Sequence, residues 1–261
     1  MHGLGNRLCN IMNMFYIHQK YPQTEIFLLW IENEHCRSKL TDLFDFSGDS
    51  YKWIKNPHEY HRKLFPKYRR QELWASTSNR CRTRWDNIDE WAKHAALVSV
   101  SFHLYQFVSC DFCIQTFQSF RVKESVTSLL QEKINKFGVG RELIHVRTGD
   151  LLVLLKHENA DVESNIQAKK KALCDKYPNH MVFDYNQLVV NRDHAHMIDS
   201  LSDLLFFSKH CALRVYSPYS WFSSWVYLLS PCFDAKHPIF DPYTVDIVEL
   251  HGLNEADVKP P

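Results

Sequence analysis

Hydrophobic residues recur at helical spacing near the start of the chain. Residues 6–20 are predicted to form a helix whose apolar stripe consists of Leu8, Ile11, Met12, Phe15 and Tyr16. The proline at position 22 is a typical helix stop. A continuous apolar run over 25–31 then predicts a buried strand, and residues 36–46 are predicted to form a second helix. This order is typical of the start of an α/β domain.

The same alternation continues through the second half of the chain. Strands are predicted at 98–107, 142–147, 181–183 and 212–216, and helices at 117–137, 162–176 and 196–210. Such alternation predicts a parallel sheet, with ligands at the carboxyl ends of the strands. The two glycines of Gly138-Val-Gly140 interrupt the pattern. We place the boundary between two α/β domains in this region of the chain, so that the first domain covers residues 1–125 and the second covers 126–261.

Length and composition fit such a two-domain protein. A chain of 261 residues can bury two separate cores. Its formal charge of +1 gives no global reason to expect nucleic acid as a partner. No apolar run reaches the ~20 residues of a membrane helix. The start of the chain lacks the basic region followed by an apolar region that is typical of a signal peptide. The sequence as given therefore indicates a cytoplasmic protein, whereas a fragment of a longer chain would suit the secretory pathway.

The eight cysteines are scattered along the chain and indicate neither a disulfide framework nor a metal site. Cys110-Asp-Phe-Cys113 is the one close pair, and no second pair stands at zinc-finger spacing. We therefore predict no metal.

Three polar segments fall at strand ends or helix starts: Gly3-Leu-Gly-Asn-Arg7, His145-Val-Arg-Thr-Gly-Asp150 and Ser217-Pro-Tyr-Ser-Trp-Phe-Ser-Ser224. Serines at a strand-to-helix switch can hold an anion together with the helix N-terminus, and they can equally serve as helix caps. The glycine turn at 3–7 lacks the strand that normally precedes such a turn. This predicts a truncated N-terminal sheet whose open edge favours self-association.

These segments together resemble the fucosyltransferase superfamily, which contains the α1,2-, α1,6- and protein O-fucosyltransferases. The first segment resembles the GxGN(Q/R) opening of that family, and the second resembles its HxRRxD signature. Ser202-Asp-Leu-Leu-Phe-Phe-Ser208, followed by the serine segment, resembles its third block. The motifs occur in the family's order and span nearly the whole chain.

The resemblance implies a GT-B-like enzyme in which two Rossmann-like domains face a cleft. The C-terminal domain would bind GDP-fucose as the donor substrate, and the N-terminal domain would bind a glycan or protein acceptor. The implied reaction is an inverting, metal-independent transfer of fucose that uses no further cofactor.

The resemblance also implies roles for individual residues. Arg147 would grip the leaving diphosphate, because a guanidinium binds phosphate oxygens as a fork, and Asn6 would act with it as a catalytic residue. The implied donor-binding residues are Gly5, His145, Asp150, Asp203, Ser220, Phe222 and Ser223. Among these, His145 and Asp203 would face the guanine, and Asp150 would order the Arg147 loop. Phe222 and Ser223 would cover the phosphates or the base, and Gly5 would meet the diphosphate or the sugar.

Departures from the family pattern keep a second hypothesis open. Thr148 replaces the second arginine of the signature, Trp221 replaces a small residue, and the segment after Asp150 is short. These features favour a catalytically inactive nucleotide-sugar-binding or scaffold protein as the alternative. A third hypothesis is a polyanion binder that uses the basic, aromatic run over 58–84. The general base is left open among Asp86, Asp89 and Glu90.

Overall fold

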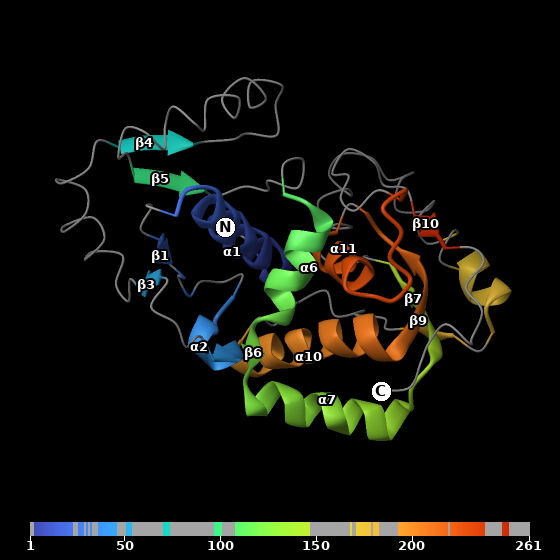
Figure 1. The fold of residues 1–261 in the computed structure, drawn as a ribbon. Helices are drawn as coiled ribbons and strands as arrows, with labels where there is room; N and C mark the ends of the chain where they lie inside the picture. Colours follow the sequence, from blue (N-terminus) through green and yellow to red (C-terminus); the bar gives the residue numbers. More distant parts are fainter. Residues whose placement is uncertain are drawn as a thin grey trace. The chain divides into compact units, whose positions relative to one another are not determined.

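The chain forms a mixed α/β fold of two compact units, Met1–Val122 and Lys123–Pro261. The structure is a computed structural model, and it describes residues 3–22, 26–28, 30, 32, 36–45, 51–53, 70–73, 97–100, 108–146, 168, 171–178, 180–182, 193–218, 220–237 and 247–250. No helix among these residues is long and apolar enough to cross a lipid bilayer. Each unit is described separately below (Figure 1).

Helix α1 (Leu4–Lys20) organises the first unit, and the sequence predicted it correctly. Leu8, Ile11 and Met12 are buried on its apolar stripe. Farther along the stripe, Tyr16 contacts Phe112 of α6 (Cys110–Gln118), with ring centroids 5.6 Å apart. The helical periodicity therefore identified the face that this helix buries.

Short strands accompany α1 in the first unit. Strand β1 (Ile26–Leu28) pairs in parallel with β3 (Tyr51–Trp53), and β4 (Arg70–Leu73) pairs in parallel with β5 (Leu97–Val100). Strands β1 and β5 lie within or at the edge of strands that the sequence predicted. Parallel pairing agrees with the predicted α/β class.

Two predicted helices are wrong in part, and one aromatic cluster explains both. The helix predicted over 36–46 is only α2 (Leu40–Leu43), followed by β2 (Phe44–Asp45). The helix predicted over 117–137 is split into α6 and α7 (Glu124–Phe137) by β6 (Arg121–Val122), which pairs with β2. Phe44 is fully buried, and its ring lies 5.5 Å from that of Phe120. This tertiary contact outweighs local helical preference.

A four-stranded sheet with the order β10-β9-β7-β8 forms the centre of the second unit. Its strands are β7 (Arg141–His145), β8 (Met181–Val182), β9 (Cys211–Tyr216) and β10 (Val248–Glu249). The predicted parallel pairing is confirmed for β7 with β8 and for β7 with β9. The two-residue strand β10 was not predicted, and it runs antiparallel to β9.

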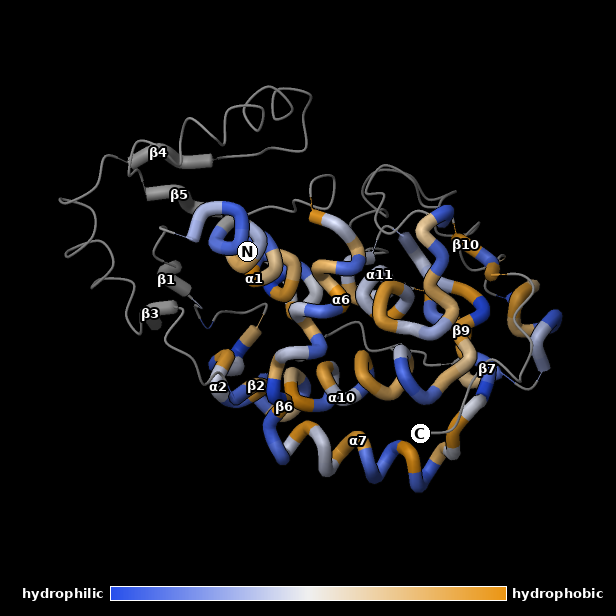
Figure 2. The backbone as a smooth tube through the Cα atoms, in the orientation of Figure 1, coloured by the Kyte–Doolittle hydropathy of each residue, from blue (hydrophilic) through white to orange (hydrophobic). Residues whose placement is uncertain are grey.

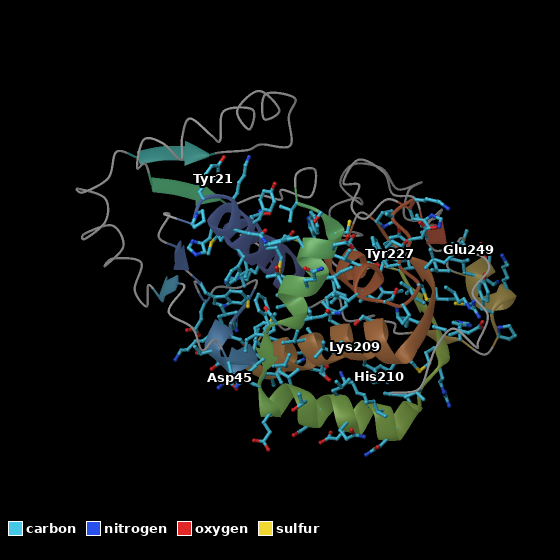
Figure 3. The ribbon with its side chains drawn as sticks, viewed as in Figure 1. Tyr21, Asp45, Lys209, His210, Tyr227 and Glu249 are labelled. Atoms are coloured by element: carbon cyan, nitrogen blue, oxygen red, sulfur yellow. The ribbon has the colours of Figure 1, made fainter. Side chains whose placement is uncertain are left out.

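Helices α7 and α10 (His194–His210) lie side by side in this unit (Figure 1). Hydrophobic residues line most of α10, whereas apolar and polar residues alternate along α7 (Figure 2). Nearly all of α10 from Met197 to Ser208 is buried, whereas α7 buries only Val126. Lys209 and His210 end α10 (Figure 3), where positive charge suits the C-terminus of a helix. Helix α10 is therefore the central core helix of this unit.

Two stacked tyrosines attach the end of β9 to helix α11 (Trp221–Leu228). The rings of Tyr216 and Tyr227 lie 4.2 Å apart and nearly parallel. The Tyr227 hydroxyl donates to the carbonyl oxygen of Asp234 at 2.6 Å and accepts from the Asp234 N–H at 2.8 Å. At β10, Glu249, labelled in Figure 3, accepts hydrogen bonds from Lys176 and Tyr177. These contacts fix α11 at the end of β9 and anchor β10, which pairs with β9.

The turn from α7 into β7 requires glycine at position 138. Gly138 has φ 76° and ψ 179°, a conformation that is essentially restricted to glycine. Its N–H donates to the carbonyl oxygen of Ile134 at 2.8 Å. An added Cβ would meet no atom within 4 Å, so the cost of substitution comes from the backbone alone.

We predict that Gly138→Ala lowers the free energy of unfolding by about 1–3 kcal/mol. Val139→Ala is the matched control, because the Val139 side chain is 46% exposed and its truncation should change stability by less than about 0.5 kcal/mol. Urea unfolding of both variants measures the difference. Equal stabilities would show that this turn does not need its glycine.

Candidate functional site

The carboxyl ends of two neighbouring parallel strands meet at one edge of the second sheet. Strand β7 ends at His145 and β9 ends at Tyr216, and these two residues are paired in the register. The register shifts between Leu143 and Ile144, which leaves Arg214 of β9 as the extra residue. The carbonyl oxygen of Arg214 accepts a hydrogen bond from the N–H of Leu250 at 2.7 Å. Residues after β7 and β9 therefore come together at this edge, which is where α/β proteins bind ligands.

His145 is buried and lies between two phenylalanine rings. Its residue exposure is 8%. The ring centroid lies 5.9 Å from that of Phe207 on α10 and 5.5 Å from that of Phe222 on α11. The predicted donor-binding residues His145 and Phe222 are thus in contact, although 77 positions separate them along the chain.

The Ser223 hydroxyl joins the serine turn to the end of β7. Its Oγ lies 2.9 Å from His145 Nδ1, 3.4 Å from the carbonyl oxygen of His145, and 2.9 Å from the backbone nitrogen of Ser217. A hydroxyl has one donor and two acceptor sites. All three contacts are satisfied together if the Ser217 N–H and a proton on Nδ1 donate to Oγ, while the hydroxyl donates to the carbonyl. We therefore assign the His145 proton to Nδ1.

The remaining serines shape the turn itself. Ser220 is the N-cap of α11, and its Oγ accepts from the Ser223 N–H at 3.4 Å. The Ser224 hydroxyl donates to the carbonyl oxygen of Ser220 at 2.9 Å. Ser217, Ser220, Ser223 and Ser224 are all buried. The capping interpretation is confirmed for Ser220, and the anion-binding interpretation of this turn stays a prediction.

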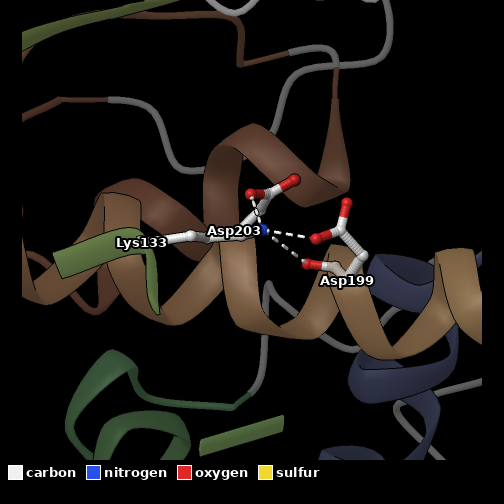
Figure 4. A network of polar contacts seen from close by, with 3 residues as sticks. All are labelled: Lys133, Asp199 and Asp203. Atoms are coloured by element: carbon white, nitrogen blue, oxygen red, sulfur yellow. Dashed lines mark hydrogen bonds and ion pairs between the residues drawn. The ribbon is translucent and has the colours of Figure 1, made fainter. Parts of the chain in front are cut away.

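Asp203 lies on the buried side of α10 and forms an ion pair that the sequence did not reveal. It is 2% exposed, and its carboxylate contacts the ammonium of Lys133 on α7. The same ammonium lies 2.6 Å from Asp199 Oδ1 and 3.4 Å from the carbonyl oxygen of Asp199 (Figure 4). The available signal was chemical, because a buried aspartate in an apolar helix requires a cation nearby. Its partner, 70 positions away, had no local signature.

The predicted residues of the first segment belong to the other unit. Gly5 is buried and Asn6 is half-buried in the first turn of α1. Arg7 follows, with its guanidinium 4.6 Å from the centroid of the Trp30 ring, and burial lowers the pKa of this guanidinium. The Trp30 indole N–H in turn donates to the carbonyl oxygen of Ser38 at 2.7 Å. Arg7 is therefore positioned by packing that the glycine motif alone did not predict.

Several candidates from the sequence lie outside the described residues. They are Arg147, Thr148, Asp150, Asp86, Asp89, Glu90 and most of the basic run over 58–84. Their roles stay predictions. Trp221, the bulky departure from the family pattern, is the first residue of α11 and is 8% exposed.

Two of the described cysteines, Cys211 and Cys113, are poor nucleophiles. Burial, reinforced by the charge of Asp203, raises the pKa of the Cys211 thiol to about 12. Burial likewise raises the pKa of Cys113 to about 12, and Cys110 adds to that shift. Both thiols are therefore protonated at neutral pH, where a reactive cysteine would be a thiolate. Across the described ranges, no group of three or more His, Cys, Asp or Glu residues is arranged to hold a metal ion.

Comparison with known proteins identifies solved structures with a similar fold, whereas comparison of the sequence with family models and curated proteins gives no match. The fold is similar to NodZ α-1,6-fucosyltransferase soaked with GDP-fucose, with a TM-score of 0.54 and 12% identity over 95% of this chain and 96% of that chain. It is also similar to selenomethionine-containing fucosyltransferase NodZ from Bradyrhizobium, with a TM-score of 0.57 and 13% identity over the same shares. The chain therefore has a fucosyltransferase-like fold.

We predict that Ser223→Ala lowers the free energy of unfolding by about 1–3 kcal/mol, because it removes the buried hydroxyl that contacts His145 Nδ1 and the Ser217 N–H. Ser224→Ala is the matched control. The Ser220 carbonyl that Ser224 Oγ contacts also accepts from the Ser224 N–H at 2.8 Å, so this variant should lose less than about 1 kcal/mol.

Chemical denaturation compares the two variants. Long-range ¹H–¹⁵N correlation spectra report the His145 tautomer in the same samples. A wild-type His145 with its proton on Nε2 would contradict the assignment made from Ser223.

Proposed function

We propose that the protein transfers fucose from GDP-fucose to a glycan or protein acceptor, with inversion at the anomeric carbon and without a metal ion. In this proposal the second unit holds the donor, the first unit holds the acceptor, and the two units are the Rossmann-like domains of a GT-B enzyme. One observation carries the proposal. The His145 segment and the serine segment, which resemble separate fucosyltransferase motifs, are hydrogen-bonded through Ser223 in a chain with a fucosyltransferase-like fold.

The described residues suit the base of the donor better than its phosphates. Phe222 and Phe207 flank His145 with apolar rings, and Asp203 contributes a carboxylate one turn before Phe207 on α10. The partly exposed Phe222 ring offers a stacking surface for a purine, the fully buried Phe207 supports His145 from the core, and a carboxylate accepts N–H donors. The arrangement therefore favours the guanosine end of GDP-fucose at the edge formed by β7 and β9.

The diphosphate would be bound by groups that follow β7 in the chain. Arg147 comes two residues after His145, and its guanidinium can bind two phosphate oxygens at any working pH. In the proposed step the acceptor oxygen bonds to the anomeric carbon as the bond from that carbon to the β-phosphate oxygen breaks. The acceptor proton passes to a carboxylate, for which Asp86, Asp89 and Glu90 are the candidates. Preorganised cations and N–H donors stabilise the charge that develops on the leaving GDP.

Titration with GDP, GDP-fucose and UDP-sugars, followed by an assay for release of GDP, tests the proposal. Binding of GDP-fucose with release of GDP supports the transferase. Binding without turnover supports the inactive nucleotide-sugar-binding alternative, which the departures at Thr148 and Trp221 favour. Salt-sensitive binding to heparin or DNA alone supports the polyanion-binding hypothesis.

We predict that Arg147→Ala weakens GDP binding by tenfold or more, because a charge-assisted hydrogen bond to phosphate contributes about 1.5–3 kcal/mol. Arg141→Ala is the matched control, since Arg141 is exposed at the opposite end of β7 and its loss should leave affinity unchanged. Isothermal titration calorimetry measures both variants. Unchanged affinity in Arg147→Ala would remove Arg147 from the donor site.

We also predict that transfer activity persists in excess EDTA, because arginine and backbone donors neutralise the diphosphate in the proposed mechanism. The measurement is GDP release from GDP-fucose with and without the chelator. Loss of activity in EDTA and its recovery on addition of manganese would point to a metal-dependent transferase instead.

A further inference from the structure

Lys133 neutralises a carboxylate that α10 buries in the core of the second unit. The Lys133 side chain is 13% exposed and that of Asp203 is 3% exposed, so neither charge is well hydrated. An ammonium has three N–H donors. Here they face three oxygen atoms, namely Asp203 Oδ1, Asp199 Oδ1 and the Asp199 carbonyl oxygen (Figure 4). The ammonium is therefore fully coordinated and holds the Asp203 carboxylate in one orientation.

The Lys133–Asp203 ion pair lies one helical turn along α10 from Phe207, whose ring contacts that of His145. Asp203 and Phe207 are one helical turn apart on α10, so their side chains are neighbours. The Phe207 ring is in turn 5.9 Å from the His145 ring. On the other side, Phe137 of α7 packs 6.0 Å from Phe206 of α10, one turn beyond Lys133. The packing of α7 on α10 thus fixes the position of the ammonium relative to the cluster.

A fixed carboxylate distinguishes guanine from the other common bases. Guanine carries adjacent N–H donors at N1 and at its 2-amino group, and a charged carboxylate can accept both through its two oxygens. Uracil and adenine lack that pair of adjacent donors. Loss of Lys133 would remove an ammonium from the buried Asp203 carboxylate, which favours either protonation or a shift of the side chain. Either change removes the two-oxygen acceptor.

We propose that Lys133 is a positioning residue for base selection, which keeps Asp203 charged and oriented to accept the N1–H and 2-amino groups of guanine. This inference rests on the proposed function, because it takes Asp203 as part of the GDP-fucose site. Lys133 itself does not contact the nucleotide. It acts through Asp203, so its loss should change the choice of base more than the binding of phosphate.

Comparison of GDP with inosine diphosphate isolates this contact. The two nucleotides carry the same sugar and phosphates, and inosine diphosphate lacks only the 2-amino group. We expect wild type to prefer GDP by about tenfold, the value of one charge-assisted hydrogen bond. In Lys133→Met and in Asp203→Asn this preference should fall to about twofold or less. Lys133→Arg, which restores the charge, should recover a large part of the preference.

Lys136→Met is the matched control, because it removes the same type of charge from the same helix. Lys136 is exposed, and its ammonium lies 4.9 Å from the centroid of the Phe137 ring. The GDP preference should therefore stay at its wild-type value in this variant. Should Lys133→Met fail to fold, Lys133→Gln replaces it, since an amide still donates one hydrogen bond to Asp203 without the charge.

The outcomes separate this inference from the proposed function. If wild type binds GDP, and the folded variant (Lys133→Met or its replacement Lys133→Gln) keeps the wild-type preference for GDP over inosine diphosphate, the role of Lys133 is overturned and the proposed function stands. If wild type does not bind GDP, the proposed function fails, and this inference fails with it. A loss of thermal stability alone, with the preference intact, would show a purely structural ion pair.

Discussion

The parallel pairing of β7 with β9 is the constraint on which the candidate site depends. It sets His145 opposite Tyr216, so that the chain leaves both strands at the same edge of the sheet. From there the serine turn folds back, and the Ser223 hydroxyl reaches both the side chain and the backbone of His145. The stack of Tyr216 on Tyr227 holds α11 against the end of β9. A shift of one residue in this register would reverse the faces of β7 and separate these groups.

The charged side chains discussed near the candidate site, Lys133 and Asp203, come from helices α7 and α10. Asp203 is buried in α10, where the Lys133 ammonium from α7 helps to offset the cost of removing its charge from water. A buried ion pair is a poor source of stability compared with apolar packing, and its value often lies in holding one specific arrangement. At this position it holds a carboxylate one turn from the Phe207–His145 contact. In the proposed function, the α7–α10 interface therefore serves recognition of the base as well as the core.

Elements with a strong periodic pattern could be predicted from the sequence. Helices α1 and α10 were expected within two residues of their observed starts, and β9 was expected within one, because α1 buries one apolar stripe and because α10 and β9 are strongly apolar segments. Ser220 was identified as a possible cap because serine is favoured at helix N-termini. The break between α6 and α7 was missed, because it depends on Phe120 packing against Phe44. No local pattern encodes a contact between residues so far apart.

The candidate site was predictable to a similar extent. His145, Phe222 and Ser223 were selected through their resemblance to family motifs, and the structure brings them into contact. Lys133 was not selected, since the amphipathic helix α7 carries two lysines, Lys133 and Lys136, and neither stands out in the sequence. Its contact with Asp203 is evident only in the structure, where the two side chains meet across the α7–α10 interface. Buried charges must be paired in three dimensions, and sequence spacing does not specify the partner.

The most direct test of this account is a crystal structure of the protein with bound GDP. The account predicts a guanine base against the rings of Phe222 and His145, with the Asp203 carboxylate within hydrogen-bonding distance of N1 and the 2-amino group. It also predicts the Lys133 ammonium still on Asp203. Guanine bound elsewhere on the chain, or bound at this edge without contact to Asp203, would contradict the account.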